Sequence, residues 1–231
     1  MRRLALVLAT IVLAGCGGDS GSSEQPAPAA TETATPTPTV DKAADKSVAR
    51  EAALKLEDFP AGWIEDGGGG EDVDTGCLTY DQATGKATAR VDAPRFKTSD
   101  KATQVLTSVH LYVDEAAAED AFGLLTAKQT RQCFAEKISG EVADQEGVEI
   151  GVIKHEPLSF DPTGDAVEGG RVTIPFETSG RSLAITLDLA FIRAGRGISL
   201  MVFGKLLSPI EATLRDDLVS TSGERLADAL A

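Results

Sequence analysis

The sequence predicts an α+β fold: an antiparallel β-sheet of about five to six strands, with a long central helix and a C-terminal helix packed on it. Three observations support this. Two segments with β-type alternation precede one long segment rich in Ala, Glu and Lys. A run of strand-like segments separated by turn residues follows, and the chain ends in an amphipathic segment. Strands and helices do not alternate regularly, so a parallel βαβ sheet is not expected.

The first expected elements lie on either side of a glycine-rich, acidic segment. Residues 47–59 have Ala and Leu at helical spacing and are followed by Pro60, which predicts a short amphipathic helix. Trp63 comes next and is interpreted as a core anchor, because it is the only tryptophan. Residues 67–74 are too rich in glycine and carboxylates to predict anything but a loop. Strands are then expected at residues 87–98 and 102–113.

The rest of the chain predicts one long helix, four strands and a final helix. Residues 114–138 have Phe122 and Cys133 at helical spacing, and Asp114 is a suitable N-cap. Ser179 and Gly180 predict a tight hairpin, as does Gly195. The expected strands are residues 148–160, 170–178, 181–194 and 196–206, and the final helix is residues 209–229.

The N-terminus has the features of a bacterial secretion signal. Two arginines precede an apolar run of about ten residues, too short to span a membrane. The run ends in Leu, Ala, Gly and then Cys16, which resembles the lipobox of bacterial lipoproteins. The resemblance implies that residues 1–15 are removed and that Cys16 is acylated. Residues 16–46 then form a lipidated, disordered tether rich in Gly, Ser, Pro and Thr, and residues 47–231 form a single globular domain.

Charge excludes two classes of partner. The chain has 22 basic and 36 acidic residues and a formal net charge of −14. Nucleic-acid binding needs clustered Lys and Arg, so no nucleic-acid partner is expected. Attraction to an anionic membrane surface is disfavoured for the same reason. We therefore expect the protein to be held at the outer face of the cytoplasmic membrane by the acyl chains on Cys16 alone.

The two remaining cysteines, Cys77 and Cys133, predict a disulfide bond. Outside the cytoplasmic membrane the environment is oxidising, and an even number of cysteines then favours pairing. The alternative is a reactive thiol, but there is no Cys-x-x-Cys motif, and only His110 and His155 could act as its base. We therefore expect a structural disulfide.

The sequence has no catalytic, metal-binding or cofactor-binding motif with the required spacing. Gly85 and Lys86 lack the earlier glycine of a phosphate-binding loop, and no nucleophile elbow or zinc-protease motif is present. The acidic groups at residues 71–74 and 161–168 do not have EF-hand spacing, and we interpret them as solvated. His110 and Tyr112 share one strand face and are interpreted as part of a half-buried sheet face rather than a pocket. His155 is expected on a strand surface. No catalytic residue, metal or cofactor is predicted.

Several short patterns resemble a known family. They are the segment from Leu56 to Trp63, Cys77, the entry at residues 112–114 into an Ala-rich helix with Cys133, and residues 193–196. Together they resemble actinobacterial lipoproteins related to the extracellular sensor domain of mycobacterial PknH-type serine/threonine kinases. The resemblance implies an antiparallel sheet with helices that form a ligand-binding cleft. The chain differs in having one possible disulfide instead of two, and no kinase domain or transmembrane helix.

The sequence thus predicts a non-enzymatic, lipid-anchored, sensor-like binding lipoprotein outside the cytoplasm. The ligand would be a small or lipidic molecule, or a protein of the cell envelope. For an apolar cavity the candidates are Phe160, Phe176, Phe191 and Phe203, although each also suits the core. Two alternatives remain: a cell-envelope hydrolase that uses a carboxylate pair, and a structural or assembly lipoprotein.

Overall fold

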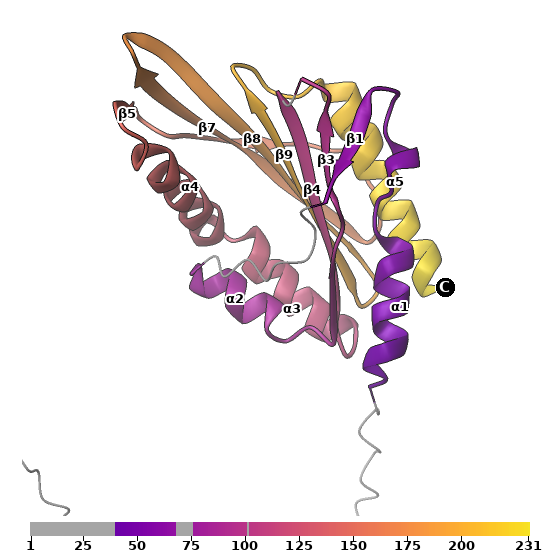
Figure 1. Ribbon diagram of the computed structural model, residues 1–231. Coiled ribbons are helices and arrows are strands. Elements are labelled where there is room, and N and C mark those ends of the chain that lie inside the picture. The colour runs from indigo at the N-terminus through magenta and orange to yellow at the C-terminus, as the bar shows by residue number, and fades with distance from the viewer. Residues whose placement is uncertain (1–39, 68–75, 101) are drawn as a thin grey trace, which may run out of the picture. The chain divides into compact units, whose positions relative to one another are not determined.

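A nine-stranded antiparallel sheet organises the part of the chain that the computed structural model describes, residues 40–67, 76–100 and 102–231 (Figure 1). The strand order is β1-β3-β4-β9-β8-β7-β5, with β2 also on β4 and β6 also on β7. The strands are β1 (Trp63–Asp66), β2 (Ala89–Asp92), β3 (Arg95–Thr98), β4 (Thr103–Leu111), β5 (Val148–Ile150), β6 (Lys154–Leu158), β7 (Ala166–Thr178), β8 (Arg181–Ala194) and β9 (Gly197–Leu206). The helices are α1 (Lys42–Ala52), η1 (Leu56–Asp58), α2 (Leu78–Thr84), α3 (Glu115–Thr126), α4 (Lys128–Ala143) and α5 (Ala212–Leu230). The predicted α+β class is confirmed.

The sheet has more strands than the five to six predicted, because two expected strands are each divided in two. Residues 87–98 form β2 and β3, which both pair with β4 on either side of Pro94. Residues 148–160 form β5 and β6, which both pair with β7 on either side of Gly151. Proline lacks an N–H for the ladder and glycine weakens a strand, so both residues interrupt regular pairing. The sequence analysis also predicted no strand at β1, which lies just before the expected loop at residues 67–74.

The hairpin of β7 and β8 agrees with the prediction. β7 pairs with β8 from Ala166 opposite Arg193 to Thr178 opposite Arg181. Ser179 and Gly180 between them both have positive φ, 52° and 73°, as a type I′ turn requires. This turn has the twist of the two strands that it joins. The long hairpin positions β7 and β6 at one edge of the sheet.

The first helix begins earlier than predicted. α1 starts at Lys42 instead of residue 47, and the side chain of Asp41 accepts hydrogen bonds from the N–H groups of Ala43 (2.9 Å) and Ala44 (3.1 Å). Asp41 is therefore the N-cap, so the last residues of the predicted tether belong to a helix. α1 also ends at Ala52, and the separate turn η1 follows.

The predicted long helix at residues 114–138 is two helices. Asp114 caps α3 as expected and accepts a hydrogen bond from the N–H of Ala117 at 2.8 Å. The chain then breaks at Ala127, whose ψ of 145° is extended. On either side, Thr126 and Thr130 donate their hydroxyls to the carbonyls of Phe122 and Leu124. Threonine hydroxyls that bond to the backbone compete with helical hydrogen bonds, which gives a local reason for the break.

The helices cover the two faces of the sheet in two groups (Figure 1). α1 and α5 pack on what we call the α1/α5 face, over a core that includes Phe96, Met201 and Phe203. α2, α3 and α4 lie on the α3/α4 face, over a core that includes Phe191 and Ile198. Within the described residues, no helix is long and apolar enough to cross a membrane.

Candidate functional site

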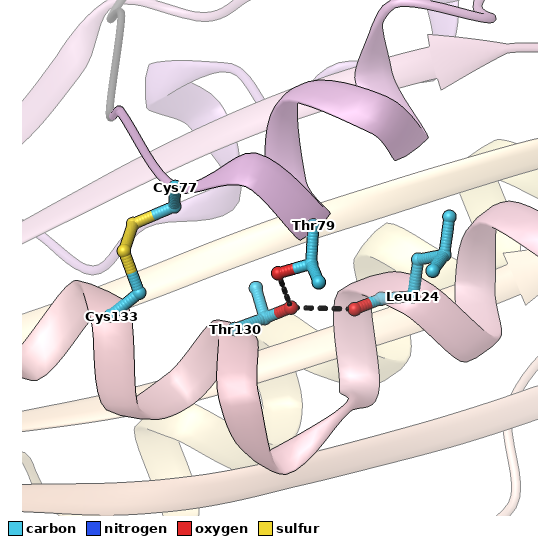
Figure 2. The surroundings of a disulfide bond; sticks show 5 residues. All are labelled: Cys77, Thr79, Leu124, Thr130 and Cys133. Atoms are coloured by element: carbon cyan, nitrogen blue, oxygen red, sulfur yellow. Dashed lines mark hydrogen bonds between the residues drawn. A yellow bond between two sulfur atoms is a disulfide. The ribbon is translucent and has the colours of Figure 1, made fainter.

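The structure joins Cys77 and Cys133 in a disulfide with an S–S distance of 2.07 Å. Figure 2 shows this bond between the start of α2 and the middle of α4. Beside it, the hydroxyls of Thr79 and Thr130 are 2.6 Å apart, and Thr130 donates to the carbonyl of Leu124 at 2.6 Å. Since the proton of Thr130 is used there, Thr79 donates to Thr130. The disulfide thus has a structural role in attaching α2 to α4. Cys16 lies outside the described residues.

His110 and Tyr112 are fully buried in the α3/α4 face, deeper than the half-buried positions predicted. Nε2 of His110 lies 3.0 Å from the hydroxyl of Ser108, whereas its Nδ1 has no partner within the described residues. Burial, assisted by Arg90, lowers the pKa of His110 to about 3, and burial raises the pKa of Tyr112. Both side chains are therefore neutral at physiological pH and out of reach of a ligand from solvent.

The four candidate phenylalanines do not line one cavity. Phe191 belongs to the core of the α3/α4 face and Phe203 to the core of the opposite face. Phe160 lies under the guanidinium of Arg215, 5.2 Å from ring centroid to Cζ. Alternating residues of a strand point to opposite faces, so aromatic residues on several strands need not meet. These residues therefore do not form an apolar cavity, and the interpretation of Phe176, Phe191 and Phe203 as buried core residues is confirmed. Trp63, by contrast, is buried against Phe59, as expected of a core residue.

The acidic segments give no metal site among the described residues. Glu71, Asp72 and Asp74 lie outside them. In the second segment, Asp165 accepts the N–H of Gly195 at 2.7 Å and lies 3.4 Å from Arg193. No group of three His, Cys, Asp or Glu side chains in the described part of the chain could hold a metal ion.

Two buried carboxylates form ion pairs. Asp188 on β8 receives two hydrogen bonds from Arg171 on β7, at 2.6 and 2.7 Å, and one from Arg215 on α5 at 3.2 Å. Asp45 on α1 pairs with Arg196 at 2.6 Å. The hydrogen bond from Arg196 lowers the pKa of Asp45. These contacts join helices to the sheet, so we assign both carboxylates a structural role.

The candidate site is a groove between α4 and β6, which we call the α4/β6 groove. Its volume is about 210 Å³. Its lining residues come from three elements: Lys128, Arg131 and Gln132 from α4, His155, Glu156 and Pro157 from β6, and Gly169 and Arg171 from β7. Two cationic side chains of α4, Lys128 and Arg131, thus line one groove in a chain whose net charge is −14, whereas the guanidinium of Arg171 is bonded to Asp188.

Glycines in β7 allow this arrangement. A Cβ added at Gly170 would lie 3.4 Å from Cδ of Arg131, so the arginine lies against the backbone of β7. A Cβ at Gly169 would lie 2.4 Å from the carbonyl oxygen of Leu189, which excludes a side chain there without rearrangement. Arg131 is also oriented by a hydrogen bond from Nη1 to the carbonyl of Thr126. The position of Arg131 at the groove is therefore fixed by its packing.

The charges on α4 oppose the dipole of the helix. Lys128 and Arg131 lie at its N-terminal end, where the dipole disfavours cations, and Glu141 and Asp144 lie at its C-terminal end, where the dipole disfavours anions. Each such charge costs about 0.3–1 kcal/mol at an exposed position. Departures from a local rule of this kind are expected at functional sites. The placement of the two cations is therefore not explained by the stability of the helix.

Sequence reasoning placed His155 on the surface but did not single out Lys128, Arg131 or Arg171. One signal was available: Lys128 and Arg131 lie one helical turn apart in an acidic chain. Their approach to His155 depends on the pairing of β6 with β7, and no sequence pattern indicated that pairing.

Comparison with solved structures gives a weak resemblance of fold. Neither a protein-family model nor a curated protein matches this chain. Among solved structures, the extracellular domain of PknH from Mycobacterium tuberculosis is similar with a TM-score of 0.39 and 9% sequence identity, over 79% of this chain and 94% of that one.

Proposed function

We propose that the protein is an extracytoplasmic binding lipoprotein that is anchored through acylated Cys16 and binds its ligand in the α4/β6 groove. The presence of Lys128 and Arg131 together in one groove of an acidic chain is the observation on which the proposal rests. A long tether between anchor and domain would keep the groove accessible above the bilayer. The Cys77–Cys133 disulfide suits the oxidising compartment that the lipobox predicts.

The alternative, a hydrolase that uses a carboxylate pair, has less support. A general acid or base must reach its substrate and exchange protons near the working pH. Asp45 and Asp188, the carboxylates buried in the described part of the chain, are instead held by arginines inside the fold. An assembly role remains the competing proposal, and the experiment below separates it from ligand binding.

The test of ligand binding is native mass spectrometry of the acylated full-length protein, purified gently from membranes. We expect a discrete non-covalent mass on the wild type that is lost on mild denaturation and is absent from a Lys128→Gln/Arg131→Gln variant. Lys137→Gln is the matched control, because Lys137 lies on the same helix but lines a different, acidic groove. A bare wild-type protein, or a stable co-purifying protein, would contradict ligand binding and favour assembly.

The anchor has its own test. Replacement of Cys16 by Ser removes the thiol that accepts the lipid. We expect the variant to move from the membrane fraction to the soluble fraction and to lose the mass of its acyl chains. Retention in the membrane without acylation would overturn the proposed anchor and leave the binding proposal to be judged separately.

A further inference from the structure

We infer that the α4/β6 groove selects a small organic anion and binds its carboxylate or phosphate group between Lys128 and Arg131. This inference rests on the proposed function and adds the chemical class of the ligand. It depends on which cations of the groove are available, on where the one carboxylate lies, on the size of the groove and on the charge of the whole domain.

Two of the three cations are available to a ligand. Arg171 is occupied, because Nε and Nη2 both donate to Asp188. Within the described ranges, Lys128 has no hydrogen-bond or ion-pair partner, and Arg131 bonds only to the carbonyl of Thr126. A guanidinium has five N–H donors, so Arg131 retains donors for a second partner while that bond orients it. An oriented guanidinium matches the paired oxygens of a carboxylate or phosphate.

The carboxylate of the groove does not neutralise these two cations by pairing. Glu156 lies opposite Arg171 in the register of β6 and β7. The pKa of Arg171 is raised mainly by the hydrogen bonds that it donates to Asp188, and the charge of Glu156 contributes less. Glu156 forms no salt bridge with Lys128 or Arg131. Gln132 and His155 add polar groups to the same lining, and both can donate hydrogen bonds to the remaining oxygens of an anion.

Size and charge exclude larger anions. A volume of about 210 Å³ is below the ~300–1,000 Å³ of pockets that enclose drug-sized ligands, so the groove is too small to enclose an acyl chain. A polyanion or an anionic membrane would face the net charge of −14 over a wide surface. A small anion would contact only the groove, because charges farther away than about 8 Å are screened at physiological ionic strength. The groove therefore favours a small anion over a charged surface or polymer.

The test is a titration of the ¹⁵N-labelled full-length protein followed by NMR. The probes are sodium phosphate and sodium succinate, with glycerol as the uncharged control and NaCl to hold ionic strength constant. We expect at least one anion, but not glycerol, to shift amides in the first turns of α4 and in β6. If the amide shifts saturate with phosphate but not with succinate, the group that the groove binds is a phosphate. If they saturate with succinate but not with phosphate, it is a carboxylate.

Variants distinguish a site from general attraction to charge. In Lys128→Gln/Arg131→Gln we expect affinity to fall at least about tenfold, because two charge-assisted contacts are lost. In Lys137→Gln the affinity should change less than about twofold, because that lysine lies among the acids of the other groove. Well-dispersed amide signals in the spectra of the double variant and of Lys137→Gln would show that both variants fold. Shifts that persist in the double variant, or the absence of any shift, would overturn the inference.

Failure of this inference can be told apart from failure of the proposed function. A neutral ligand that co-purifies with the wild type and is lost in the double variant would keep the groove as a binding site and overturn the anion assignment. If no mass co-purifies and no probe binds, both proposals fail.

Discussion

The two faces of the sheet are stabilised in different ways. On the α1/α5 face, buried ion pairs join helices to the sheet: Asp188 with Arg215 at 3.2 Å and Asp45 with Arg196 at 2.6 Å. α5 also buries a row of residues that includes Leu218, Val219 and Leu226. On the α3/α4 face, α4 buries only Thr130, Ala135 and Val142, and a disulfide attaches it to α2.

Under the proposed function, this difference separates the part of the domain that stabilises the fold from the part that binds the ligand. A helix with a wide buried stripe contributes to the stability of the fold through apolar burial. α4 has a narrow buried stripe and charges that oppose its dipole, so a covalent bond compensates for weak packing. Such a helix can present cations to a ligand without loss of the core beneath it. The α1/α5 face therefore supports the fold, and the α3/α4 face provides the groove.

The largest effect is expected from removal of the buried carboxylate on the α1/α5 face. Asp188→Ala leaves Arg171 and the buried Arg215 without their partner, and we expect a loss of about 3–5 kcal/mol in the free energy of unfolding by chemical denaturation. The control is Asp216→Ala, which removes a half-exposed partner of the same Arg215 and should cost at most about 1 kcal/mol. Equal losses in both variants would show that burial of the pair is unimportant.

Removal of the disulfide should weaken the other face. For Cys77→Ser/Cys133→Ser, which opens a loop of 56 residues, we expect a loss of about 2–4 kcal/mol. Hydrogen exchange would show where the protection is lost. Amides of α2 and α4 should exchange faster, whereas those of α5 should keep their relative protection. A uniform loss over both faces would contradict the separation that we describe.

A smaller, pH-dependent effect is expected at Asp45. Because the hydrogen bond from Arg196 lowers its pKa, the folded state binds this proton less tightly than the unfolded chain does. The stabilisation is therefore complete above the unfolded pKa of about 3.9 and is lost as the pH falls through the lower folded pKa. At pH 7 we expect Asp45→Asn to be less stable by about 1.5–3 kcal/mol. Denaturation at a series of pH values should show this gap closing below about pH 4; a constant gap would exclude the ion pair as its cause.

Much of the fold could be predicted from local signals. Ser179 and Gly180 indicated their hairpin, Asp114 indicated a helix start, and the count of cysteines indicated the disulfide. The sequence did not predict where several helices begin and end. The break at Ala127 depends on threonine side chains that bond to the backbone, and α2 is a seven-residue helix attached by the disulfide. Neither has a periodic signal of useful length.

The groove could not be predicted because its residues are distant in the chain. Lys128 and Arg131 approach His155 only after β6 pairs with β7 and α4 packs beside them. The long helix predicted at residues 114–138 also concealed that Lys128 begins a new helix. The unfavourable position of its charge could be recognised only once that boundary was known.

Chemical denaturation of the wild type and of Lys128→Glu, with and without phosphate at constant ionic strength, tests the central claim most directly. Without phosphate, the variant should be equally stable or more stable by about 0.3–1 kcal/mol, because glutamate suits the N-terminal end of α4. With phosphate, or with succinate in its place where the NMR titration assigns a carboxylate, the wild type should gain stability through binding and the variant should not. A variant that is less stable without phosphate, yet gains as much from phosphate as the wild type, would show that Lys128 serves the fold and not a ligand.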